Sequence, residues 1–222
     1  METKVSYADD TSLSGVQLGI VEASGTKWES LPASAELAEG RASFMARGPG
    51  SIAPARKTAV RDMLRHGSYK PAGRAKPSSE YLFQSAQEGE FPFVNFPVDA
   101  VNLVSLVTGY PISVVDLGKS GTTLLLKRGG QGDSYVFNAG GQEIDLTDLL
   151  CLYRQAGGLW IPTANPVRDS MATKIFPGAT ELAAFIYAPA GPEGRDLDAA
   201  CRMLAELLST CASKVEYRTI SV

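Results

Sequence analysis

Histidine and cysteine are scarce in this chain of 222 residues, which contains one histidine and three cysteines. A histidine-rich metal site is excluded, and the spacing of Cys151, Cys201 and Cys211 is not a zinc-binding pattern. His66 is the only imidazole that could serve a Ser-His-Asp triad, and its sequence neighbours are mostly basic. We therefore expect no metal and no cofactor, and cysteines that are structural.

Long apolar segments are also missing. No apolar run approaches the ~20 residues that a membrane-spanning helix needs. The first ten residues, METKVSYADD, lack the basic and apolar regions of a secretory signal. We expect a cytoplasmic protein in a reducing compartment, without a membrane partner.

The hydrophobic spacing predicts an α+β fold. Helical periodicity occurs over residues 32–47, 54–66, 78–88, 97–108 and 197–211. Short strand-like segments bounded by turn residues occur at 13–22, 111–117, 122–128, 134–139, 143–146, 149–154, 158–162, 181–190 and 215–221. Most of these turns suit antiparallel hairpins. The Gly-Lys-Ser at 118–120 is interpreted as one of these turns and not as a phosphate-binding loop, because such a loop needs a glycine at the position that Ser113 occupies.

Basic residues are concentrated in one segment. Residues 56–76 carry a formal charge of +6 against −3 for the whole chain, and only Asp62 opposes the basic side chains there. Such a cluster on an acidic protein is typical of polyanion binding, and the alternative is a solvated helix and loop. The candidate RNA-binding residues are Lys57, Arg61, Arg65, Arg74 and Lys76.

A resemblance to a known family covers about residues 55–190. Four segments match in order and spacing: KPSSEYL (76–82), VNFPVDAVNLVSLVTGYPISVVDL (94–117), LLLKRGG (124–130) and NPVRDSMATKIFPGATELAAFIYAP (165–189). They resemble the B3/B4 domain of the phenylalanyl-tRNA synthetase beta subunit, and more closely the free-standing B3/B4-domain proteins. The resemblance implies mixed and antiparallel sheets that form a cleft and are packed with helices. Residues 55–222 would form this B3/B4-like domain, with residues 1–54 as an integral N-terminal strand and helix portion.

The family's activity in the synthetase is hydrolysis of a wrongly attached tyrosine from the tRNA for phenylalanine. The chain keeps the family asparagine as Asn102, but Val101 and Ser113 replace a threonine and a histidine of the synthetase editing pocket. The free-standing relatives share a pattern that is present here as Arg168, Asp169, Ser170, Thr173 and Lys174. The other parts of a synthetase have no counterpart, so we do not expect a complete tRNA ligase.

Hydrolysis of an aminoacyl ester needs a positioned water, a proton acceptor and a donor to the oxyanion. The candidate catalytic residues are Asn102, Ser113 and Asp169, and Asp169 could instead bind a free α-amino group. Arg168, Ser170, Thr173 and Lys174 are the candidate substrate-binding residues. We expect Asn102, Ser113 and the 168–174 loop to meet in one cleft.

Three functions are compatible with the resemblance. The first is a tRNA-editing-like protein that binds tRNA or an aminoacyl group and hydrolyses misacylated tRNA. The alternative is a non-catalytic RNA- or amino-acid-binding module with a degenerate editing site, and a synthetase partner is a third possibility. Each of these candidates also has a purely structural alternative. Asn102 could be a core amide with satisfied hydrogen bonds, and Ser113 could be a small strand residue. Arg168 and Asp169 could form an isolated ion pair.

Overall fold

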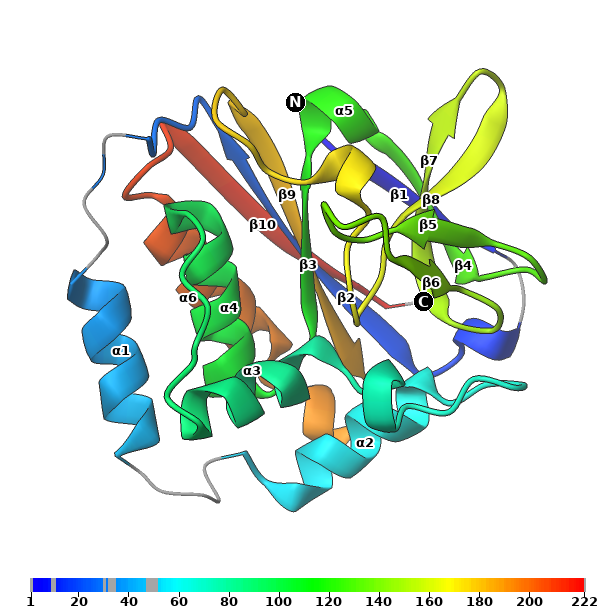
Figure 1. The fold of residues 1–222 in the computed structure, drawn as a ribbon, viewed down its shortest axis with the longest axis horizontal. Helices are drawn as coiled ribbons and strands as arrows, with labels where there is room; N and C mark the ends of the chain where they lie inside the picture. Colours follow the sequence, from blue (N-terminus) through cyan, green and yellow to red (C-terminus); the bar gives the residue numbers. More distant parts are fainter. Residues whose placement is uncertain (1, 9–10, 30, 32–34, 47–51, 222) are drawn as a thin grey trace.

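The computed structural model describes residues 2–8, 11–29, 31, 35–46 and 52–221 (Figure 1). The helices of this part are α1 (Ala35–Met45), α2 (Pro54–Leu64), α3 (Ser78–Gln87), α4 (Phe96–Thr108), α5 (Leu117–Ser120) and α6 (Leu197–Leu208). The strands are β1 (Lys4–Tyr7), β2 (Val16–Ser24), β3 (Ile112–Asp116), β4 (Thr123–Arg128), β5 (Ser134–Val136), β6 (Glu143–Asp145), β7 (Leu150–Ala156), β8 (Leu159–Ala164), β9 (Glu181–Pro189) and β10 (Lys214–Ser221).

A four-stranded antiparallel sheet of order β10-β2-β9-β3 crosses the middle of the molecule (Figure 1). Helices α4 and α6 lie against one of its faces, with α1 outside α4. The helices come close to the strands, since a Cβ added to Gly19 of β2 would lie 2.4 Å from the Cys201 sulfur of α6. Strands β2 and β9 are buried along most of their length because both faces of this sheet are covered.

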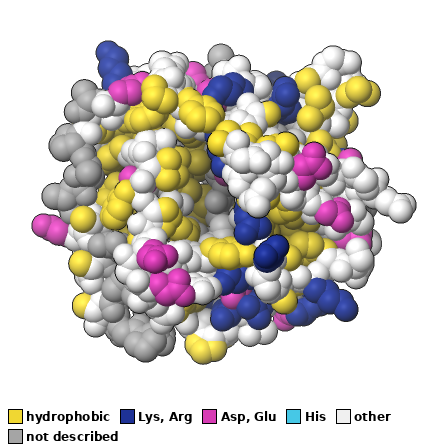
Figure 2. All heavy atoms as spheres, viewed as in Figure 1, with side chains coloured by type: hydrophobic (Ala, Val, Ile, Leu, Met, Phe, Trp, Pro, Cys, Tyr) yellow, Lys and Arg dark blue, Asp and Glu magenta, His cyan; other side chains and the backbone are white. Residues whose placement is uncertain are grey.

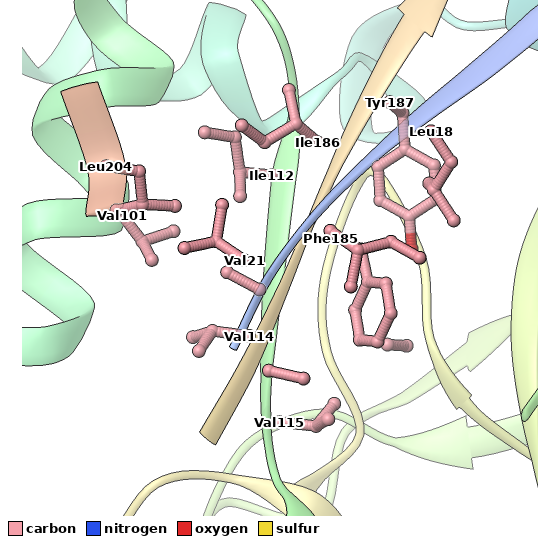
Figure 3. Packing of buried hydrophobic residues seen from close by; sticks show 14 of the residues in the cluster. Leu18, Val21, Val101, Ile112, Val114, Val115, Phe185, Ile186, Tyr187 and Leu204 are labelled. Atoms are coloured by element: carbon pink, nitrogen blue, oxygen red, sulfur yellow. The ribbon is translucent and has the colours of Figure 1, made fainter. Parts of the chain in front are cut away.

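Side chains of the central sheet point to both of its faces, and the buried ones on both faces belong to one core cluster. Figure 3 shows Val21, Ile112 and Ile186 on the side of Val101 from α4 and Leu204 from α6. On the opposite side of the same strands lie Leu18, Phe185 and Tyr187. This alternation follows from the two-residue repeat of a strand. Only every second residue of β3 can therefore face a site beside the helices.

A second sheet of order β1-β4-β7-β8 lies beside the first, and a small β5–β6 ribbon lies against it (Figure 1). β1 pairs with β4 in parallel, and the other pairs of this sheet are antiparallel. The buried residues of both sheets belong to one core cluster, in which β2 of the N-terminal portion is central. The predicted α+β class, with mixed and antiparallel sheets packed with helices, is confirmed.

One of the predicted turns differs in the structure. Gly118–Gly121 is not a hairpin turn, because β3 and β4 belong to different sheets and Leu117–Ser120 forms the single-turn helix α5. Asp116 caps this turn by accepting a hydrogen bond from the Gly118 N–H. Direct hairpins between consecutive described strands are formed by β5–β6 and β7–β8.

None of the helices described is both long enough and apolar enough to cross a bilayer. Helix α1 covers most of the helix expected over residues 32–47, and residues 32–34 and 47 lie outside the described part.

Candidate functional site

A cavity of about 350 Å³ lies where the helices meet the β5–β6 ribbon and the loop before β9. This volume is at the lower end of those of small-molecule sites, which range over roughly 300–1,000 Å³. The lining residues include four of the predicted site residues: Asn102, Arg168, Asp169 and Lys174. The other lining residues are Ser78, Ile112, Phe137, Asn138, Asn165 and Val167.

Helix α4 brings Asn102 to this cavity. The Asn95 side chain caps the helix by accepting a hydrogen bond from the Val98 N–H at 3.0 Å, and Gly109 ends it with a φ of 75°. Most of α4 is buried, but Asn102 is partly exposed, and its side chain hydrogen-bonds to none of the residues that the structure describes. The amide is therefore not a satisfied core group, and it is free to bind a ligand or a water.

Asn165 shapes the loop that carries Arg168 and Asp169. Its side chain is buried, and its Oδ1 accepts hydrogen bonds from the N–H groups of Val167 and Arg168 at 2.7 and 2.8 Å. Its amide nitrogen donates to the Tyr135 hydroxyl, which donates to the Arg168 carbonyl at 2.6 Å. These hydrogen bonds fix the backbone on both sides of Arg168, so the side chains of Arg168 and Asp169 extend from a rigid loop.

Asp169 is the acidic residue among those that line the cavity. Its Oδ2 accepts a hydrogen bond from the Val114 N–H of β3 at 3.1 Å, whereas its Oδ1 is buried and accepts none from the described residues. Burial raises the pKa of Asp169 to about 7, although the Val114 N–H, the Lys174 ammonium and the Asn165 N–H act to lower it. A carboxyl group with this pKa exchanges its proton near neutral pH, as a general base must.

Arg168 is held between two aromatic rings. Its guanidinium carbon lies 5.0 Å from the Tyr81 ring centroid and 4.9 Å from that of Phe137. Its nitrogens donate to the Arg74 carbonyl at 3.1 Å and to the Tyr81 hydroxyl at 3.2 Å. The ion pair with Asp169, the structural alternative for these two residues, does not form. Within the described residues Arg168 has no acidic partner within ion-pair distance.

Lys174 reaches the cavity from the end of the same loop. Its ammonium donates to the Phe137 carbonyl at 2.6 Å, and burial lowers its pKa while the charge of Asp169 acts to raise it. The two other predicted substrate-binding residues, Ser170 and Thr173, are buried and do not line the cavity. Ser170 caps the short 3-10 helix Met171–Thr173 by accepting a hydrogen bond from the Ala172 N–H. The Thr173 hydroxyl accepts a hydrogen bond from the Thr163 hydroxyl and donates one to the Thr163 carbonyl.

Ser113 is not brought to the cavity. It lies next to Ile112 in β3, and neighbouring strand residues point to opposite faces. Ile112 lines the cavity, whereas Ser113 has no exposed surface and its hydroxyl is 2.9 Å from the Tyr187 hydroxyl. The expected convergence therefore holds for Asn102 and the 168–174 loop but not for Ser113.

The basic segment is partly neutralised by an acid that follows it in the sequence. Glu80 of α3 accepts two hydrogen bonds from Arg61, both at 2.6 Å, and lies 3.4 Å from the Lys57 ammonium. These contacts raise the pKa of Arg61. Arg65 pairs with Asp62, and Lys76 lies 4.3 Å from the Tyr81 ring centroid and donates to Gln84.

Basic side chains nevertheless remain at the surface. Lys57 and Arg65 are about half exposed, and Arg74 is exposed. Figure 2 shows Lys and Arg side chains near the centre of this face of the molecule and below it, over the end of α2 and the loop that follows. The predicted polyanion-binding surface is thus accessible, with a smaller unpaired charge than the sequence suggests.

Asn165 and Ser78 are among the lining residues that were not predicted from the sequence as site residues. Asn165 lies within the matched segment 165–189, but its role depends on backbone groups of its own loop, which no spacing pattern indicates. Ser78 is the first residue of α3, after Pro77 in the N-cap position, and it lines the cavity.

A comparison with protein-family models and with curated proteins finds no match to this chain. The interpretation of the cavity therefore depends on its own geometry and on the resemblance described above.

Proposed function

We propose that this chain is a free-standing tRNA-editing-like protein that binds the aminoacyl end of a tRNA in the cavity and hydrolyses the ester bond of misacylated tRNA. The observation that carries the proposal is the presence of unpartnered polar groups in one small cavity. The Asn102 amide is partly exposed at the cavity and the Asp169 Oδ1 is buried in its wall, and neither forms a hydrogen bond to the described residues. Buried polar groups in native proteins are almost always paired, so the unpaired Asp169 oxygen favours a polar ligand.

In this proposal Asp169 is the general base. It accepts a proton from a water that attacks the carbonyl carbon of the ester, and Asn102 orients the carbonyl or the water. The ammonium of Lys174 stabilises the developing oxyanion. When the ester C–O bond breaks, the proton held by Asp169 moves to the leaving ribose oxygen, and the products are a free amino acid and an uncharged tRNA end.

The basic segment would hold the body of the tRNA. Lys57, Arg65 and Arg74 are exposed enough to contact phosphates, and such contacts release counterions. We expect salt-sensitive retention of tRNA at low ionic strength, weakened by Lys57→Glu together with Arg65→Glu. Lys214→Glu on β10 is the matched control, since Lys214 is exposed outside the basic segment. Retention that does not change with salt would contradict RNA binding through this surface.

The alternative, a non-catalytic module that binds RNA or an amino acid, is favoured by one observation. Ser113 is fully buried and bonded to Tyr187, so the chain has no reactive group at the position of the synthetase histidine. In that case the Asp169 carboxylate would pair with the ligand's ammonium group, and no turnover would follow.

A deacylation screen of the purified protein against charged and mischarged tRNAs separates the two functions. The proposal predicts turnover of at least one substrate, lost in Asp169→Asn and reduced about 10²-fold or more in Asn102→Ala, as for the loss of a group that acts in the transition state. Asn102→Ala should melt close to the wild type, because the amide has no protein partner in the described chain. Asp198→Asn, an exposed carboxylate on α6, is the matched control and should keep full activity. Binding of a charged tRNA without any turnover would support the alternative.

A further inference from the structure

Ser78 is a further cavity-lining residue with an unpartnered polar atom. It lies in the first turn of α3, and its own N–H donates to the Pro166 carbonyl at 2.9 Å, which fixes it beside the 165–169 loop. Its Oγ is buried and forms no hydrogen bond to the described residues. An unpaired buried hydroxyl is unfavourable, so a ligand atom that accepts its hydrogen bond would be stabilising.

Arg168 supplies a cation to the same cavity. Its hydrogen-bond partners are the neutral oxygens of Arg74 and Tyr81, and no carboxylate of the described chain pairs with it. A guanidinium has five N–H groups, so donors remain after these two bonds. The contacts with the Tyr81 and Phe137 rings hold its plane in place before a ligand binds.

We infer that Ser78 and Arg168 form a subsite for one phosphate group of the ligand, next to the position of the aminoacyl group. The inference rests on the proposed function. In an aminoacyl ester the carboxyl group of the amino acid is bonded to the ribose, so it carries no negative charge. The remaining anion of an aminoacylated terminal nucleotide is its phosphate, which an arginine and a hydroxyl at a helix start are suited to bind.

The test uses adenosines that carry alanine, serine or tyrosine through a non-hydrolysable 3′-amide, each with and without a 5′-phosphate. Binding to the full chain is measured by calorimetry. We expect the phosphate to tighten binding to the wild type about tenfold, and this gain to disappear in Ser78→Ala and Arg168→Gln. Arg202→Gln is the matched control, because Arg202 is an exposed arginine on α6 that does not line the cavity.

Each remaining outcome contradicts a different part of the inference. If the unphosphorylated compounds bind and the phosphate adds nothing, or if both variants keep the gain, the phosphate subsite is wrong while the proposed function stands. If a free amino acid binds as tightly as the phosphorylated compounds and loses affinity in Arg168→Gln, the anion is a carboxylate and the phosphate assignment is wrong. If no compound binds the wild type, the proposed function fails, and the subsite fails with it. Ser78→Ala removes a hydroxyl that has no hydrogen-bond partner among the described residues, so it should fold normally even if Arg168→Gln does not.

Discussion

Asp169 is expected to destabilise the folded protein when it is ionised, and Asp169→Asn should reveal this. Burial raises the folded-state pKa from 3.8 to about 7. A group with a raised pKa contributes its full stability below the unfolded-state value, and that stability is lost as the pH rises through the folded-state value. The free energy of unfolding of the wild type should therefore fall by about 2–3 kcal/mol between pH 5 and pH 8 through this group alone, and by about 4 kcal/mol over its complete titration.

Asparagine has nearly the same shape and keeps an oxygen that can accept from the Val114 N–H, but it does not ionise. Urea unfolding at pH 5, 6, 7 and 8 should show that Asp169→Asn removes this part of the pH dependence and is more stable than the wild type at pH 8. The same substitution should abolish activity. Asp198→Asn, with its exposed carboxyl group, should keep the wild-type pH dependence. An Asp169→Asn variant that is less stable than the wild type at pH 8 would refute the desolvation argument.

Two further predictions concern residues that support the site and the core. Asn165→Ala should lower the free energy of unfolding by about 2–4 kcal/mol, because two backbone N–H groups lose their acceptor. It should also weaken ligand binding, because the loop that carries Arg168 loses these hydrogen bonds. Urea unfolding measures the first effect and calorimetry the second, and an unchanged stability would contradict the role of Asn165. The cysteines should react slowly with iodoacetamide in the native protein, because burial raises the pKa of Cys201 to about 12, that of Cys211 to about 11 and that of Cys151 well above its usual range. Rapid labelling of any cysteine at pH 7, detected by mass spectrometry, would contradict their burial.

Local sequence signals predicted most of the elements because those signals are complete within a short segment. Helix α4 has its cap, its proline and its terminal Gly109 within fifteen residues, and α6 shows one continuous apolar stripe. The short strands from β3 to β8 are each bounded by turn residues. Strand β1 was missed, because its four residues KVSY carry little apolar pattern and are stabilised by pairing with β4, far along the chain.

Tertiary partners were not predictable in the same way. The pairing of Ser113 with Phe185 decides that the serine faces Tyr187 and not the cavity, and this register depends on a strand about seventy residues away. The contact of Glu80 with Arg61 depends on how α3 packs beside α2, so the sequence overestimated the free charge of the basic segment. Asn102 could be predicted as a candidate because an amide within an otherwise apolar helix needs polar partners, and the structure places it at the cavity.

The most direct test of the central claim is a crystal structure of the protein with one of the non-hydrolysable aminoacyl adenosines. We predict that the aminoacyl group occupies the cavity, with polar atoms within about 3 Å of the Asn102 amide and of the Asp169 Oδ1. A ligand bound elsewhere on the protein, or an empty cavity at a saturating concentration of the compound, would contradict the claim that these residues form an aminoacyl site.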